Sequence, residues 1–119
     1  MLGEKLHEEC GVFGVHINTQ EAAGITYNAL SALQHRGQEG AGIAVLSKNA
    51  ILCHKDVGLV SEVFNGDTLK KLPASGIGIG HVRYSTAGSS TRENAQPLVL
   101  KYAKGTLAIA HNGNLTNTV

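Results

Sequence analysis

The stretch Gly76-Ile77-Gly78-Ile79-Gly80-His81-Val82-Arg83-Tyr84 decides between two fold classes. Its alternating glycines resemble part of a dinucleotide-binding fingerprint, which would indicate a doubly wound parallel sheet. That fingerprint requires a strand before the glycines and a helix that opens after them. Here the glycines lie within the strand pattern, and the residues from His81 onward continue it. We therefore interpret 76–84 as one strand that another backbone or a ligand approaches closely.

The segments around this strand indicate a domain made mostly of strands. Strands are expected at 11–17, 41–47, 50–55, 98–103 and 106–111, with hairpin turns around Lys48-Asn49 and Lys104-Gly105. Short helical turns are expected at 58–64 and 68–72, and a polar loop at 85–97. This order favours an α+β domain with mostly antiparallel pairing.

One longer helix is predicted over about 20–35. Ala22, Ile25, Ala29 and Leu33 fall on one of its faces. Asn18, with Glu21 three residues later, resembles a capping box that starts the helix. Gly37 is suited to the left-handed conformation that closes a helix.

Composition narrows the class of function. The chain has 119 residues and a net charge of +1, with 42% hydrophobic and 4% aromatic residues. Nothing in this balance points to nucleic acid or to a membrane surface, and no segment resembles a signal peptide or a membrane span. The two cysteines form no disulfide framework and no zinc pattern, so a reducing, cytoplasmic setting and no metal in this chain are expected.

Cys10 follows a short acidic leader and begins the first apolar run. A lone cysteine is commonly a small buried hydrophobe. If the chain were cut before Cys10, however, its α-amino group, with a reference pKa near 7.7–8.0, would be a suitable general base beside the thiol. The sequence therefore leaves two interpretations open, a buried structural thiol and an N-terminal nucleophile.

Arg83 and the pair Asn112-Gly113 are the other candidates for chemistry. Arg83 lies in an apolar strand, where it would form either an internal salt bridge or a bidentate fork for a substrate carboxylate. Asn112-Gly113 is typical of a tight turn, and the same turn could present an oxyanion hole. His81 has a plain packing role as its alternative, and Arg36 that of a solvated cation at a helix end.

Five motifs, in order along the chain, resemble one known family. They are Cys10-Gly11-Val12-Phe13-Gly14, the segment 33–43 with Gln34-His35-Arg36-Gly37-Gln38, the segment 80–88, Asn94-Ala95-Gln96-Pro97-Leu98, and the segment 110–115. Together they resemble the N-terminal glutaminase domain of the amidophosphoribosyltransferases, the first committed enzymes of purine synthesis. The glutaminase domain of glucosamine-6-phosphate synthase is the nearest alternative, and it is similar at Cys-Gly and His-Asn-Gly only.

The resemblance implies a fold and a set of roles. The fold is the αββα four-layer sandwich of the N-terminal-nucleophile hydrolases, here truncated. Residues 1–9 would be a propeptide, and 10–119 the first part of a type-2 glutamine amidotransferase domain. The implied roles are Cys10 as nucleophile, Asn112 and Gly113 as oxyanion hole, Arg83 for the glutamine α-carboxylate, His81 and Thr86 in the glutamine pocket, and Arg36 on the loop over the site.

The resemblance also implies partners that this chain would not bind alone. Ammonia released from glutamine would convert phosphoribosyl pyrophosphate to 5-phosphoribosylamine in a second domain, which is missing here. Mg²⁺, and in leader-bearing members a 4Fe-4S cluster, would belong to that missing part, and the full-length protein would be a homo-oligomer. Alternatives of other classes are a truncated, inactive module with weak glutamine binding, and an amide hydrolase on the same scaffold.

Overall fold

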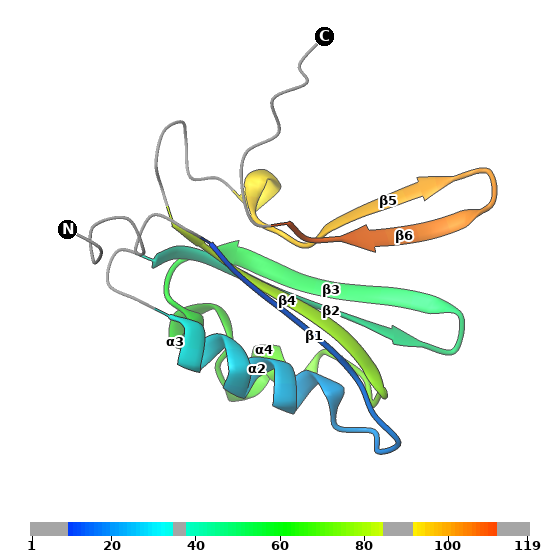
Figure 1. Cartoon of the computed structure of the whole chain (residues 1–119), viewed down its shortest axis with the longest axis horizontal. Helices are drawn as coiled ribbons and strands as arrows, with labels where there is room; N and C mark the ends of the chain where they lie inside the picture. The colour runs from blue at the N-terminus through cyan, green and yellow to red at the C-terminus, as the bar shows by residue number, and fades with distance from the viewer. Residues whose placement is uncertain (1–9, 35–37, 85–91, 112–119) are drawn as a thin grey trace, which may run out of the picture.

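The computed structural model describes residues 10–34, 38–84 and 92–111. They form a layer of helices, a four-stranded sheet and a two-stranded sheet, in that order (Figure 1). The strands of the larger sheet are β1 (Gly11–His16), β2 (Gln38–Ser47), β3 (Ala50–Val57) and β4 (Ile77–Tyr84). The smaller sheet contains β5 (Leu98–Tyr102) and β6 (Gly105–Ile109). The helices are α2 (Ala22–Leu33), α3 (Val60–Val63), α4 (Gly66–Lys70) and the 3-10 turn η1 (Arg92–Asn94).

The strand predicted over 76–84 lies inside the larger sheet. The strand order is β1-β4-β2-β3, and all its strand pairs are antiparallel. This confirms the choice against a doubly wound parallel sheet. The glycines of β4 permit close packing, because a Cβ on Gly80 would lie 2.5 Å from Thr26 and 3.1 Å from Leu30 of α2.

The two faces of the larger sheet have different neighbours. Alternate side chains of β4 point toward the helices, and the Tyr84 hydroxyl donates to the Leu33 carbonyl oxygen at 3.0 Å. This face carries the core, which includes Leu30, Ile43, Val45, Val60, Val63, Phe64 and Val82. The other face carries His81 and Arg83 and lies toward the β5-β6 hairpin (Figure 1).

The predicted capping box of α2 is wrong. The N-cap residue is Glu21, and no side chain caps the helix. Instead, the backbone of Ser75 holds this end: the Ala22 amide donates to the Ser75 carbonyl at 2.9 Å, and the Ser75 amide donates to the Gln20 carbonyl at 3.2 Å. A tertiary contact therefore replaces the local cap. The helix ends at Leu33, before Gly37, which lies outside the described residues.

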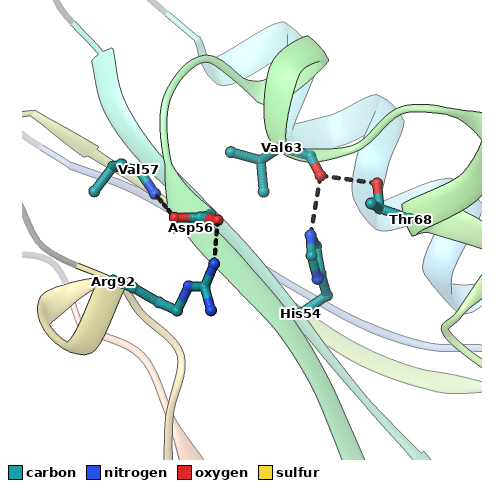
Figure 2. A network of polar contacts seen from close by, with 6 residues as sticks. All are labelled: His54, Asp56, Val57, Val63, Thr68 and Arg92. Carbon is teal, nitrogen blue, oxygen red and sulfur yellow. Dashed lines mark hydrogen bonds and ion pairs between the residues drawn. The ribbon is translucent and has the colours of Figure 1, made fainter.

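Polar contacts fasten β3 to its neighbours on both sides (Figure 2). On the helix side, the Val63 carbonyl lies 3.1 Å from Nε2 of His54 and accepts from the Thr68 hydroxyl at 2.8 Å. On the opposite side, Arg92 of η1 forms an ion pair of 2.8 Å with Asp56. These bonds join the larger sheet to the helix layer and to the segment that leads into the smaller sheet.

Candidate active site

Cys10 lies directly before β1, at the end of the sheet where β4 finishes. Gly11 pairs with Val82, and Val12 pairs with His81. The same register, continued by one residue, sets Cys10 opposite Arg83. Because side chains alternate along a strand, these positions share the face that carries His81. Extrapolated in this way, the register pairs two positions 73 residues apart (83 − 10) that the sequence analysis singled out separately.

Arg83 is half-buried, and one of its nitrogens is engaged. Its Nη1 donates to the Asn94 carbonyl oxygen at 3.3 Å. No carboxylate pairs with Arg83 in the part of the chain that the structure describes. The salt-bridge alternative therefore has no partner there, and the rest of the guanidinium fork is compatible with a carboxylate ligand.

His81 is fully buried. Its Nε2 lies 3.1 Å from the His111 carbonyl oxygen. A carbonyl oxygen only accepts, so Nε2 carries the proton and Nδ1 does not. Burial lowers the pKa of His81 to about 4, partly offset by the hydrogen bond to the His111 carbonyl and assisted by the electrostatic influence of His111 and Arg83, so the ring is neutral at pH 7. Nδ1 has no hydrogen-bond partner among the described residues.

Gln96 also contacts His111, although the sequence analysis assigned it no role. Its Oε1 accepts from the His111 amide at 2.7 Å. Its carbonyl lies so close over β2 that a Cβ on Gly42 would collide with it. Gln96 lies in a polar loop before a proline, and nothing in that local sequence indicates these contacts. The structure thus adds Gln96 to the residues that, like His81, contact the His111 backbone.

Four predicted site residues, Arg36, Thr86, Asn112 and Gly113, lie outside the described residues. Their chain neighbours are placed. Gln34 and Gln38 stand on either side of 35–37, and both Oε1 atoms accept from the Val60 amide, at 2.8 and 3.1 Å. His111 directly precedes Asn112. The described residues on either side of 35–37 are therefore held by hydrogen bonds from the Val60 amide.

Cys53, the other thiol, has a different environment. It lies in β3, with Sγ 4.0 Å from the Pro97 carbonyl oxygen. Burial raises the pKa of its thiol despite the nearby Lys55. A thiol with a raised pKa is a poor nucleophile at neutral pH, which makes Cys53 an internal comparison for Cys10.

Two cavities lie elsewhere on the described part. One, of about 570 Å³, is lined by Cys53, His54, Lys55, Lys71, Arg92 and Val99. Two of its cations are already engaged: Lys55 donates to the Pro97 carbonyl at 3.2 Å, and Arg92 pairs with Asp56. The other, of about 730 Å³, lies where β1 ends and β4 begins, near His16 and Ile77. This is the end of the larger sheet opposite to Cys10. Neither has Cys10 or Arg83 in its lining.

Neither a metal-binding cluster nor a membrane-spanning helix is found among the described residues. They include no group of three or more residues suited to hold a metal ion. None of the helices among them is long and apolar enough to cross a membrane.

Comparison with known proteins gives a consistent result. A family model for class-II glutamine amidotransferases matches residues 9–119. The chain is 53% identical over 115 residues to an amidophosphoribosyltransferase of Synechocystis sp., covering 97% of this chain and 23% of that protein. It is 54% identical over 114 residues to the chloroplastic amidophosphoribosyltransferase 3 of Arabidopsis thaliana, covering 96% and 21%.

Solved structures agree. One, described as the allosteric regulatory enzyme of purine biosynthesis, superposes with a TM-score of 0.72 at 46% identity, covering 82% of this chain and 21% of that one. The glutamine phosphoribosylpyrophosphate amidotransferase of B. subtilis, complexed with ADP and GMP, gives 0.71 at 44% identity, covering 83% and 21%. This likeness confirms the predicted N-terminal-nucleophile fold. The chain spans less than a quarter of the length of these relatives.

Proposed function

Because the chain belongs to the class-II glutamine amidotransferases, we propose that Cys10 is the nucleophile that hydrolyses glutamine in an amidophosphoribosyltransferase. The observation that supports the proposal is the register of β1 and β4, in which Gly11 pairs with Val82; continued by one residue, it would set Cys10 opposite Arg83 on one face of the sheet. A thiol next to a guanidinium suits a substrate that has both an electrophilic carboxamide and a free α-carboxylate. Glutamine has this pair of groups, whereas an internal peptide bond lacks the carboxylate. The glucosamine-6-phosphate synthase alternative has no support from the relatives found.

Removal of residues 1–9 would expose the α-amino group of Cys10. That amine takes the thiol proton, and the thiolate attacks the side-chain carbonyl carbon of glutamine. Asn112 and the Gly113 amide donate to the oxyanion that forms; removing one such donor costs about 3–4 kcal/mol in comparable sites. The protonated amine then gives its proton to the leaving nitrogen, the carbon–nitrogen bond breaks and ammonia departs.

Water completes the reaction. It attacks the γ-glutamyl thioester while the α-amino group of Cys10 accepts one of its protons; the carbon–sulfur bond breaks, the thiolate takes that proton, and glutamate is released. Arg83 holds the α-carboxylate throughout, while Thr86 lines the glutamine pocket and Arg36 orders the loop over it. In the complete protein the ammonia displaces pyrophosphate from phosphoribosyl pyrophosphate and forms 5-phosphoribosylamine.

Mg²⁺ and an iron–sulfur cluster belong, in this proposal, to the part of the protein beyond this chain, as does assembly into a homo-oligomer. Two thiols that form no disulfide are compatible with a reducing, cytoplasmic compartment.

Two variants of the complete protein test the nucleophile. Cys10→Ala should abolish synthesis that depends on glutamine and retain synthesis from ammonium ions. Cys53→Ala is the matched control and should retain both. Loss of both activities in Cys10→Ala would contradict the assigned role, as would a Cys10→Ala protein that still uses glutamine.

A glutamine analogue with an electrophilic diazoketone tests the site directly. Peptide mass spectrometry should find the adduct on Cys10 and not on Cys53. The mass of the active protein should also show that the chain begins at Cys10. A fully active protein that keeps residues 1–9 would exclude the α-amino group as the base.

A further inference from the structure

Both polar groups of the His111 backbone are held by side chains. Gln96 accepts from the amide at 2.7 Å, and His81 lies 3.1 Å from the carbonyl oxygen. The two side chains come from the segment before β5 and from the middle of β4, so they approach from separate parts of the chain. A residue bonded through both its N–H and its C=O has little freedom to rotate about its own backbone.

Each of the two side chains is itself fixed. His81 is fully buried, and it donates through Nε2, so its ring cannot turn over without losing the bond. The backbone of Gln96 is pressed against Gly42, where no side chain could be accommodated, and the Pro97 that follows is buried. The contacts to His111 therefore start from positions that the larger sheet sets.

We propose that His81 and Gln96 are positioning residues that orient the oxyanion donors by clamping the His111 backbone. The inference rests on the proposed function, because Asn112, the next residue, and Gly113 are the donors in that mechanism. His81 thereby takes a different role from the pocket-lining one that the family resemblance implied. In this role it acts on the transition state through the backbone of His111.

This role predicts a particular kinetic signature. Donors aimed at an oxyanion act in the transition state and contribute little to ground-state binding. Loss of the clamp should thus lower kcat with little effect on KM, whereas loss of a glutamine contact should raise KM. Since a misplacement of about 1 Å costs on the order of 100-fold in rate, the expected loss in kcat is about 10- to 100-fold.

Matched pairs of substitutions in the complete protein separate the clamp from simple packing. Gln96→Met keeps the length of the side chain and removes the acceptor, whereas Gln96→Glu keeps an acceptor oxygen. His81→Phe fills the space and removes the donor, whereas His81→Gln can place an amide N–H near the position of Nε2. Gln96→Met and His81→Phe should lower kcat for glutamine about 10- to 100-fold with KM within about 2-fold of the parent, and Gln96→Glu and His81→Gln should recover most of kcat. Lys101→Gln, on an exposed position of β5, controls for the handling of the variants.

Amide hydrogen exchange of the peptide that contains His111 gives a readout without catalysis. Exchange there should be faster in Gln96→Met and His81→Phe, and near the parent value in Gln96→Glu. A rise in KM at constant kcat, or equal loss of kcat in Gln96→Met and Gln96→Glu, would overturn the clamp. If the parent protein does not hydrolyse glutamine and Cys10 is not labelled, the proposed function fails, while hydrogen exchange still decides whether the clamp exists. If a variant does not fold, the other matched pair carries the test.

Discussion

Gln38 and Val60 are joined by a hydrogen bond in which the Val60 amide donates to Gln38 Oε1 at 3.1 Å. The same buried side chain donates through Nε2 to the carbonyl oxygens of Gly40 and Gly58, at 2.6 and 2.7 Å. One amide group therefore satisfies an N–H and two carbonyls where β2 starts and α3 begins. Only an amide, with both donor and acceptor, can do so.

Gln38→Glu should consequently be strongly destabilising. A carboxylate would face two carbonyl oxygens with no proton to donate, and burial of such a mismatch costs about 3 kcal/mol. Gln34→Glu is the matched control, because Gln34 Oε1 only accepts, from the Val60 amide at 2.8 Å. Urea unfolding of the two variants should give a large loss for position 38 and a loss below about 1 kcal/mol for position 34. Equal losses would show that the Gln38 amide is not oriented as described.

Gly42 should not tolerate a side chain. A Cβ there would collide with the Gln96 carbonyl and lie 2.8 Å from the Lys55 Cβ, so Gly42→Ala must push the backbone of one segment away. The expected cost is about 1–3 kcal/mol. Gly24→Ala, within α2 and with no atom beyond its chain neighbours and its own helix backbone within 4 Å of the new Cβ, should instead stabilise the protein by about 0.5–1 kcal/mol.

Thermal unfolding of these two glycine variants, measured side by side, checks both the expected loss of stability in Gly42→Ala and the expected gain in Gly24→Ala. A neutral Gly42→Ala would mean that the 96–97 segment does not lie against β2. Since this segment carries Gln96, the same result would also argue against the hydrogen bond from the His111 amide to Gln96.

The neutral, buried state of His81 predicts sensitivity to acid. Its pKa falls from 6.5 to about 4 on folding. Between these values the unfolded chain binds a proton that the folded chain does not, so stability decreases as the pH falls from about 6.5 to about 4. The full effect is roughly 3 kcal/mol. Urea midpoints measured over this range should fall more steeply in the parent than in His81→Gln, and parallel curves would contradict the depressed pKa.

Asp56 and Arg92 predict a smaller effect of the same direction at lower pH. The hydrogen bond from Arg92, then that from the Val57 amide, lowers the pKa of the Asp56 carboxyl. The pair therefore stabilises the fold above the ordinary carboxyl pKa, near 3.9, and this contribution disappears as the pH falls through the lowered folded value.

The NMR titration of Asp56 measures this shift directly. Arg92→Ala should move the pKa of Asp56 part of the way back toward its ordinary value, because the Val57 amide still donates at 2.8 Å. Arg92→Lys should retain more of the shift. An unchanged titration in Arg92→Ala would show that the ion pair does not persist in solution.

The strands were predictable because their signal is local. Apolar runs bounded by Gly, Asn and Lys turns located β1, β3, β4 and the β5-β6 hairpin within a few residues. The start of β2 at Gln38, three residues earlier than expected, was not predictable. There a buried polar side chain is stabilised by Gly58 and Val60, about 20 residues away along the chain. The capping box of α2 was wrongly predicted for the same reason, since Ser75 supplies the backbone partner that a local cap would have supplied.

The candidate site was predictable by residue type and not by arrangement. Cys10 and Arg83 stand out because a thiol at the head of an apolar run and a cation within one are unusual. Their common face depends on the β1-β4 register, which no short stretch of sequence encodes. Gln96 was missed because its importance lies in where its two oxygens point, toward Gly42 and toward the His111 amide.

The side chains of β4 alternate between the two faces of the sheet. The number of residues in this strand is therefore more strictly constrained than their identity. One extra residue after Gly80 would turn His81 and Arg83 toward Thr26 and Leu30, and would expose apolar groups to the side that now faces Cys10. A gain or loss of two residues would preserve the sidedness. Lineages that carry this domain are thus expected to diverge in β4 by exchange of side chains, and to accumulate indels in the turns that follow it.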